Sequence, residues 1–143
     1  MLRIALFSLV TLLISPLSFG ATLQSISKKE FEHVFVNKTA TSIGTVQSDG
    51  NFINIPFSMY MDNHGKIWAT LDTNSATDIP KTDEGTYTIG KDGTLYLKWN
   101  HWFKSQRLCA HLFNAKDGYL VLGCNNVFQT VFMKNEIASG KTF

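Results

Sequence analysis

The clearest pattern in the chain is an alternation of apolar and polar residues in the segment NFINIPFSMYM, residues 51–61. Every second position from Ile53 to Met61 is apolar, and most of the positions between them are polar. A period of two is typical of a β-strand with one buried face. Pro56 has no amide hydrogen to give to a neighbouring strand, so it predicts a strand edge or a bulge at this point.

Turn residues and a second alternation follow this strand. The tetrapeptide DNHG, residues 62–65, is rich in turn formers, and KIWATL, residues 66–71, places its aliphatic residues on one face with Trp68 opposite. These two segments are therefore expected to form a β-hairpin.

Further strands and turns continue to the end of the chain. Segments with strand character stand at residues 42–47, 85–89, 94–99, 106–113, 119–124 and 126–133. The long connection in the middle is the polar segment 73–84. About eight short strands joined mostly by tight turns predict a mainly β fold, an antiparallel meander that forms a small lipocalin-like barrel or a sandwich.

One short helix is predicted before the strands, at residues 28–36. Ser27 followed by Glu30 is a capping-box pattern, and Phe31 and Phe35 follow at helical spacing. A helix of this length is not stable alone, so we expect it to pack its phenylalanine face against the sheet.

The first 20 residues have a different character. Arg3 precedes an apolar run at residues 4–14, and small residues precede a boundary at Gly20/Ala21. This layout predicts a signal peptide, residues 1–20, and export of a single domain, residues 21–143, to the periplasm or the cell exterior. An uncleaved anchor is the alternative, but the run is shorter than the roughly 20 residues of a spanning helix, so no stable membrane insertion of the mature chain is expected.

Charge and motifs exclude several classes of function. The chain has 13 basic and 11 acidic residues without a basic stripe, which argues against nucleic acid as a partner. No HExxH, GxSxG or phosphate-binding glycine loop occurs, and Asp83 and Glu84 point to opposite faces if they lie on a strand. We therefore expect a protein that is not an enzyme and has no cofactor or metal.

Both cysteines lie in the segment LCAHLFNAKDGYLVLGC, residues 108–124. If Lys116 and Asp117 are the central residues of a hairpin turn, facing residues have numbers that sum to 233, and Cys109 and Cys124 satisfy this condition. The register predicts a disulfide, which in a loop of about 15 residues contributes about 3 kcal/mol. The alternatives are a redox couple, which lacks the CxxC spacing, and a metal site with His111, which needs reduced thiols and a fourth ligand.

The segment WNHWFKSQR, residues 99–107, gathers aromatic residues in a predicted connection. Aromatic side chains in a loop can stack on sugars, enter a lipid interface or close a barrel over a ligand, and they can equally fold inward and fill the core. The candidate ligand-binding residues are Trp99, His101, Trp102, Phe103 and Tyr87.

Short motifs follow one another in a characteristic order: a helix with paired phenylalanines, D-x-x-G-K, G-T-Y, D-G-x-L, a tryptophan, a cysteine and a closing glycine. From the G-T-Y motif onward, the matching residues are Gly85, Tyr87, Asp92, Gly93, Leu95, Trp99, Cys109 and Gly140. This order resembles a family of small exported bacterial domains of unknown function, in which G-x-W precedes D-G-x-L-C and a second cysteine follows. The resemblance implies a lipocalin-like barrel outside the cytoplasm and no established activity.

Two positions depart from that family pattern. Tyr87 stands where the family usually has tryptophan, and Tyr96 stands where its first cysteine would be. The resemblance then implies that Cys109 has lost its usual partner and that Cys124 replaces it.

The apolar strand faces and the many aromatic residues predict a non-enzymatic protein that binds a small apolar or amphipathic ligand at the mouth of the barrel or in its lumen. Eight strands can enclose an interior that side chains fill completely, so a solid lumen is the competing expectation. The alternative function is a protein-interaction module, such as an inhibitor of a hydrolase or a secreted host-interacting factor, acting through residues 99–107.

Overall fold

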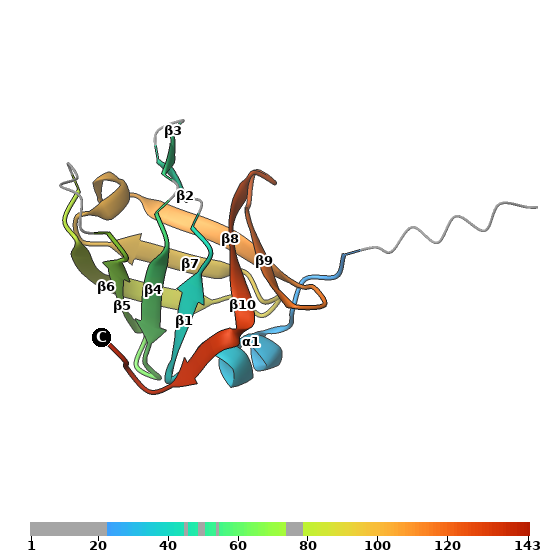
Figure 1. Ribbon diagram of the computed structural model, residues 1–143. Coiled ribbons are helices and arrows are strands. Elements are labelled where there is room, and N and C mark those ends of the chain that lie inside the picture. Colours follow the sequence, from blue (N-terminus) through green and yellow to red (C-terminus); the bar gives the residue numbers. More distant parts are fainter. Residues whose placement is uncertain (1–22, 45, 49–50, 54, 74–78) are drawn as a thin grey trace, which may run out of the picture.

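The computed structural model describes residues 23–44, 46–48, 51–53, 55–73 and 79–143. Within these residues, eight antiparallel strands close a barrel, and a short helix lies at one end (Figure 1). The predicted mainly β architecture with one N-terminal helix is confirmed, and the barrel is the form that the meander takes. The predicted signal peptide, residues 1–20, lies outside the described residues.

The chain forms its elements in a simple order. They are α1 (Lys28–Phe35), β1 (Lys38–Ser42), β2 (Val46–Ser48), β3 (Asn51–Ile53), β4 (Phe57–Met61), β5 (Lys66–Leu71), β6 (Thr82–Ile89), β7 (Leu95–Trp99), η1 (Trp102–Ser105), β8 (Arg107–Asn114), β9 (Gly118–Gly123) and β10 (Phe128–Ser139). Each strand from β4 to β10 pairs with the next, and β1 closes the ring between β10 and β4. The pair β2 and β3 forms a separate hairpin that projects beyond the barrel (Figure 1).

The hairpin of β4 and β5 is confirmed, and its register explains the sequence pattern. Met59 faces Ala69 across the pair, and both are almost completely buried. The inward residues of the two strands therefore share the lumen, because alternate side chains of paired strands lie on the same face. In the turn, the Asp62 carboxylate accepts hydrogen bonds from the backbone amides of His64 and Lys66, at 2.9 and 2.8 Å.

The structure corrects the expectation of a single strand over residues 51–61. β3 ends at Ile53 and β4 begins at Phe57, so Pro56 separates two strands that belong to different sheets. The Phe57 amide donates to the Ser42 hydroxyl at this break, at 3.1 Å. Apolar residues alternate in the sequence on both sides of the break, so the pattern does not reveal it. Asn54 lies outside the described residues.

Three other strand boundaries were also wrong. The predicted strand 42–47 is divided between the end of β1 and the start of β2, and β1 itself begins at Lys38. The connection 73–84, of which residues 74–78 are not described, ends early because β6 begins at Thr82. β10 continues to Ser139 because it pairs with β1 there, where Thr39 faces Ala138. These segments are mainly polar, so no apolar alternation marked them as strands.

The helix α1 closes one end of the barrel with its phenylalanine face. Its N-cap is Ser27, whose hydroxyl accepts from the Glu30 amide at 3.2 Å, as the capping pattern predicted. Phe31 and Phe35 are 0% and 1% exposed, and the Phe35 ring centroid lies 5.2 Å from that of Tyr119. Burying these rings stabilises the short helix, which helix propensity alone cannot do.

Candidate functional site

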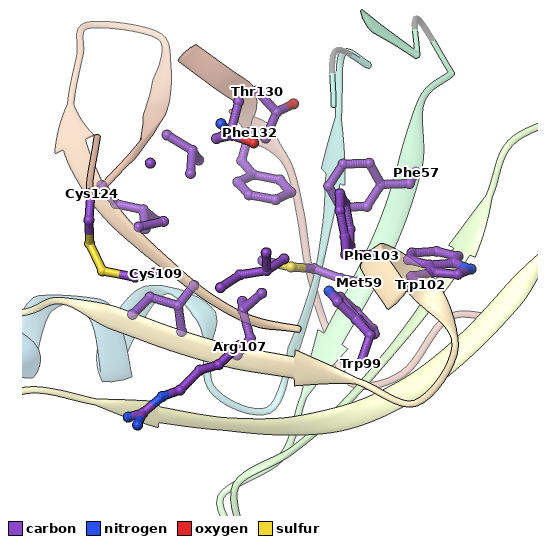
Figure 2. A pocket seen from close by; sticks show the side chains of 18 of the residues that line it. Phe57, Met59, Trp99, Trp102, Phe103, Arg107, Cys109, Cys124, Thr130 and Phe132 are labelled. Carbon is purple, nitrogen blue, oxygen red and sulfur yellow. A yellow bond between two sulfur atoms is a disulfide. The ribbon is translucent and has the colours of Figure 1, made fainter. Parts of the chain in front are cut away.

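The barrel encloses a cavity of about 490 Å³ (Figure 2). It lies at the end opposite α1, where β4, β8 and β10 begin and β5, β7 and β9 end. Its volume falls within the range of about 300 to 1,000 Å³ that is usual for small-molecule sites. Apolar side chains form most of the wall, among them Phe57, Met59, Trp99, Leu112, Val121 and Phe132. The lumen is therefore filled at the helix end and hollow at the other end.

The predicted aromatic segment forms part of this wall. Trp99 ends β7 and Trp102 begins η1; their side chains are 4% and 5% exposed, and their ring centroids are 5.0 Å apart. The Trp102 indole nitrogen donates to the Pro80 carbonyl at 2.8 Å, which satisfies its polar group while the ring stays buried. Phe103 also lines the cavity and is half-buried. These three aromatic residues thus fold inward around the hollow end.

The Asp83 carboxylate holds the aromatic segment in place. Its side chain is 1% exposed, and one oxygen accepts from the backbone amides of His101 and Trp102, at 2.9 and 2.7 Å. The other oxygen accepts from the Glu84 amide at 2.9 Å and lies 3.0 Å from the His101 Nδ1. A buried carboxylate is tolerated only with such a set of donors.

The same contacts determine the acidity of Asp83. Burial alone raises the pKa of this carboxyl, but the hydrogen bonds from the Trp102 amide, the His101 side chain and the neighbouring amides outweigh it and lower the pKa below its ordinary value of 3.8. Sequence reasoning considered Asp83 only as a partner of Glu84. The opposite orientation of these two residues on β6 is confirmed, since Glu84 is exposed. The sequence signal for the role of Asp83 was an acidic residue at a position of β6 whose side chain points into the barrel.

The turn after Trp102 has an unusual backbone. Phe103, Lys104 and Ser105 have φ angles of 53°, 54° and 57°, the left-handed region that non-glycine residues rarely adopt. Such a conformation costs roughly 1–2 kcal/mol per residue. The hydrogen bonds of Asp83 and the burial of Trp102 offset this cost, so the aromatic segment is a strained element held by its neighbours.

Two of the candidate residues lie away from the cavity wall. The His101 side chain is 68% exposed and contacts Asp83 from the outside. Tyr87 is buried near the helix end, where its hydroxyl donates to the Asp62 carbonyl. Burial raises the pKa of Tyr87 to about 12, and the Asp62 carboxylate adds to the rise. The structure therefore brings together Trp99, Trp102 and Phe103, and it separates Tyr87 and His101 from them.

Among the described residues, the polar ones that also line the cavity are Arg107, Asn125, Gln129 and Thr130. The Arg107 guanidinium lies over the Tyr96 ring, 4.7 Å from its centroid, and Figure 2 shows this side chain extending away from the other lining residues. Asn125 and Gln129 hydrogen-bond to the backbone of Val127. Thr130 is 3% exposed, and its hydroxyl finds no hydrogen-bond partner in the described part of the chain. Sequence reasoning missed Thr130, because a threonine in a strand is unremarkable until its partners are known.

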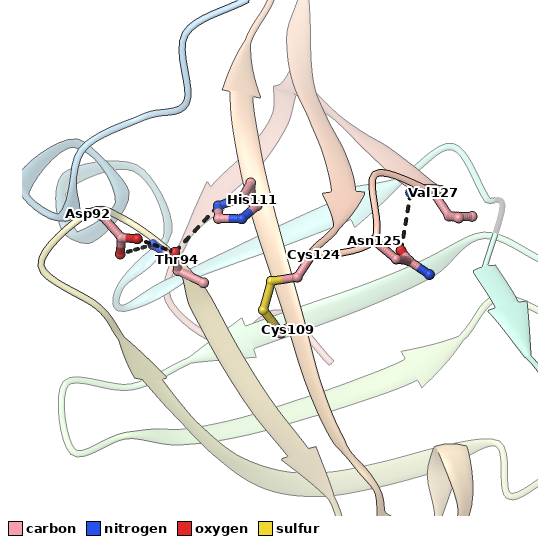
Figure 3. Close-up of a disulfide and its surroundings, with 7 residues drawn as sticks. All are labelled: Asp92, Thr94, Cys109, His111, Cys124, Asn125 and Val127. Carbon is pink, nitrogen blue, oxygen red and sulfur yellow. Dashed lines mark hydrogen bonds between the residues drawn. A yellow bond between two sulfur atoms is a disulfide. The ribbon is translucent and has the colours of Figure 1, made fainter.

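The predicted disulfide between Cys109 and Cys124 is confirmed, and it borders the cavity (Figure 3). The Ala115 amide donates to the Gly118 carbonyl at 2.9 Å, and the facing residues of β8 and β9, such as His111 and Leu122, have numbers that sum to 233. The Cα atoms of the two cysteines are 5.5 Å apart. Since both sulfur atoms are used in this bond, they are not thiolate ligands for a metal.

His111 lies on the outer face of β8 beside the disulfide, because it alternates with the inward residues Ala110 and Leu112. Its Nδ1 lies 3.4 Å from the Thr94 hydroxyl, which donates to the Asp92 carboxylate at 2.8 Å (Figure 3). Among the residues that the structure describes, no group of three or more histidine, cysteine or acidic side chains is arranged to hold a metal ion. In the same ranges, no helix has the length and apolar character required to cross a membrane.

Several motif residues have evident structural roles. Gly93 has a φ of 85°, and a Cβ atom there would collide with the Ile26 carbonyl. Gly85 lies so close to the Lys98 carbonyl that a Cβ atom would also collide. A side chain larger than hydrogen cannot fit at either position without moving the backbone.

Fold and site together define a small eight-stranded antiparallel barrel with a disulfide and a hollow, aromatic-lined end. Comparisons with models of protein families, with curated proteins and with solved structures find no match to this chain. The resemblance to a particular family of exported domains therefore stays a prediction.

Proposed function

We propose that this protein is a non-enzymatic binding protein that holds a small apolar or amphipathic ligand in the cavity at the hollow end of the barrel. The observation that carries this proposal is the cavity of about 490 Å³ with its mainly apolar wall and two buried tryptophans. An apolar ligand in this space would remove both its own surface and that of the wall from water, which is worth about 25 cal/mol per Å² of apolar surface.

The state of Asp83 supports a binding role over a catalytic one. This carboxylate contacts the backbone of Trp102, which lines the cavity, and both of its oxygens already accept hydrogen bonds. A general acid or base works best with a pKa near the working pH, whereas the pKa of Asp83 is lowered. Asp83 is thus suited to hold the wall of the cavity in place.

We further propose that the protein is exported to the periplasm or the cell exterior and belongs with the small exported barrels that its motifs resemble. The oxidised pair Cys109 and Cys124 supports this, because disulfides persist mainly in oxidising compartments. The signal-peptide pattern at residues 1–20 points the same way.

The alternative of a protein-interaction module has less support. It would use residues 99–107, and interface hot spots usually rest on accessible aromatic or arginine side chains. Trp99 and Trp102 are only 4% and 5% exposed, and the exposed Arg107 is engaged with the Tyr96 ring, so this surface offers a partner mainly polar side chains such as that of His101 and little aromatic area. An inhibitor of a hydrolase or a secreted host-interacting factor would need the loop to rearrange.

Tryptophan fluorescence gives a direct test of ligand binding. The chain has three tryptophans, and Trp68 lies on the outer face against Tyr60, with ring centroids 5.8 Å apart. In a Trp68→Phe variant, the emission comes only from Trp99 and Trp102, which line the cavity. Titration with medium-chain alcohols and lipids should give a saturable spectral change, and native mass spectrometry should show one bound molecule.

A matched pair of substitutions locates the binding. Ala110→Phe places a ring in the cavity, whereas Leu122→Phe places the same ring on the outer face of the adjacent strand. We expect the first variant to lose binding and the second to keep it. A protein that responds to no apolar compound, or an Ala110→Phe variant that binds normally, would contradict the proposed function.

A further inference from the structure

The polar chemistry of the cavity indicates which ligands it prefers. We propose that it selects an uncharged amphipathic ligand, such as an alcohol, ketone or ester, over carboxylates, phosphates and amines with the same hydrocarbon chain, and that the polar group of the ligand pairs with Thr130. This inference rests on the proposed function, since it names the class of ligand for the same cavity.

Among the described residues of the wall, no charge is available to a charged ligand. Among the described residues that line the cavity, Arg107 is the one with an ionised side chain, and its guanidinium lies over the Tyr96 ring on the outside of the barrel. The nearby Asp83 carboxylate already accepts four hydrogen bonds, and its negative charge disfavours an anion at the wall.

Desolvation also disfavours a charged ligand in this cavity. A carboxylate, phosphate or ammonium group that enters an apolar cavity loses its hydration, and this loss is large when no opposite charge replaces the water. A neutral hydroxyl or carbonyl loses much less, and a single hydrogen bond can compensate it. The apolar side chains around the space, such as Met59, Leu112 and Phe132, provide no such compensation for an ion.

The hydroxyl of Thr130 offers a neutral ligand a hydrogen-bond partner at the cavity. This residue faces the lumen from β10, as Phe132 does two positions later, and both line the cavity. Its buried hydroxyl has no hydrogen-bond partner within the described ranges, which is rare for a buried polar group. Rotation about χ1 can turn the hydroxyl toward the space, where it can donate to a carbonyl or accept from an alcohol. A neutral ligand would supply the partner that Thr130 does not find among the described residues.

The test compares four probes with the same ten-carbon chain at pH 7: decane, decanol, decanoate and decylammonium. Binding to the Trp68→Phe protein is followed by tryptophan emission, and native mass spectrometry gives the stoichiometry. We expect decanol to bind at least about tenfold more tightly than either ion, a difference of about 1.4 kcal/mol. Equal or tighter binding of decanoate or decylammonium would overturn the proposed selectivity while leaving ligand binding itself intact.

A second measurement isolates Thr130. Thr130→Val preserves the shape of the side chain and removes the hydroxyl, and Thr88→Val makes the same change at an exposed position of β6. We expect Thr130→Val to weaken decanol binding about fivefold with little effect on decane, and Thr88→Val to affect neither. Equal losses for decane and decanol would show that Thr130 acts only through packing. If none of the four probes binds, the proposed function fails, and the selectivity fails with it.

Discussion

The two ends of this barrel are built in opposite ways. At the helix end, Phe31 and Phe35 fill the lumen, and the Phe35 ring packs against Phe31, Tyr119 and Phe132. At the hollow end, a strained turn at residues 103–105 and the two tryptophans border a cavity of about 490 Å³. One end contributes packing energy, and the other end carries strain and empty space.

This contrast suggests a division of roles within a small domain. Binding sites commonly store backbone strain and unsatisfied polar groups, which the rest of the structure must offset. Here the filled end and the Cys109–Cys124 disulfide, which joins two strands beside the cavity, add to the local offset from Asp83 and Trp102. Stability and the proposed binding function can therefore be perturbed separately.

Removal of an aromatic ring from the filled end should have the largest effect. Phe35→Ala leaves a cavity where the ring now contacts three others, and we expect a loss of about 3–5 kcal/mol in the free energy of unfolding, measured with urea. The matched change Phe103→Ala removes a half-buried ring that already borders empty space, so its cost should be much smaller. Similar costs for the two variants would remove the distinction between the ends.

Loss of the disulfide should have the next largest effect. Simultaneous Cys109→Ala and Cys124→Ala substitutions should lower the free energy of unfolding by about 3 kcal/mol, because the unfolded chain gains the freedom of a 15-residue loop. Hydrogen exchange should accelerate more in the flanking parts of β8 and β9 than in α1. Uniform acceleration across the barrel would indicate that the bond stabilises both ends equally.

Much of the filled end and of the disulfide could be predicted from the sequence, because the determining signals are local. The capping residues and paired phenylalanines identified α1, and the spacing around one turn related Cys109 to Cys124. The polar strand β1 was placed too late, because its partners β4 and β10 lie far along the chain. A strand whose outer side is covered by the C-terminal segment lacks the alternation that marks a half-buried sheet.

The hollow end was only partly predictable. The cluster of aromatic residues identified the segment 99–107, but their inward direction depends on Asp83, which lies 18 residues before His101. The Thr130 hydroxyl has no partner among the described residues, and this has no signature in the sequence because it depends on which groups fail to reach the hydroxyl. Features that depend on partners far apart in the sequence, or on the absence of a partner among the described residues, could be found only in the structure.

Substitution of Asp83 should lower the free energy of unfolding by a smaller amount, and this amount should depend on pH. Asp83→Asn puts an amide group where donors now converge on both oxygens, and we expect a loss of about 2 kcal/mol at pH 7, with weaker protection of the Trp102 amide in hydrogen exchange. Glu84→Gln, at the exposed neighbouring position, is the control and should change little.

The sign of the pH effect follows from the lowered pKa. The folded-state pKa of Asp83 lies below 3.8, so its contribution is complete above the unfolded-state pKa of about 3.9 and is lost as the pH falls through the folded-state value. The gap in stability between the wild type and Asp83→Asn should therefore narrow only in acid, as urea unfolding at several pH values will show. If the two proteins became equally stable near neutral pH, the result would contradict a carboxylate whose two oxygens both accept hydrogen bonds.

The smallest changes in stability are expected for two buried threonines, one near each end of the barrel. The Thr39 hydroxyl donates to the Gly140 carbonyl at 2.7 Å and accepts from the Thr142 amide at 3.2 Å, whereas the Thr130 hydroxyl has no partner in the part of the chain that the structure describes. Thr39→Val should therefore destabilise the unliganded protein by about 1–2 kcal/mol, and Thr130→Val should leave its stability unchanged or raise it by up to about 1 kcal/mol. Both substitutions preserve shape, so differential scanning calorimetry of the two variants reports the hydrogen bonds alone. A destabilised Thr130→Val variant would mean that this hydroxyl already has a hydrogen-bond partner without a ligand. The main evidence that the ligand of the hollow end carries a polar group would then be lost.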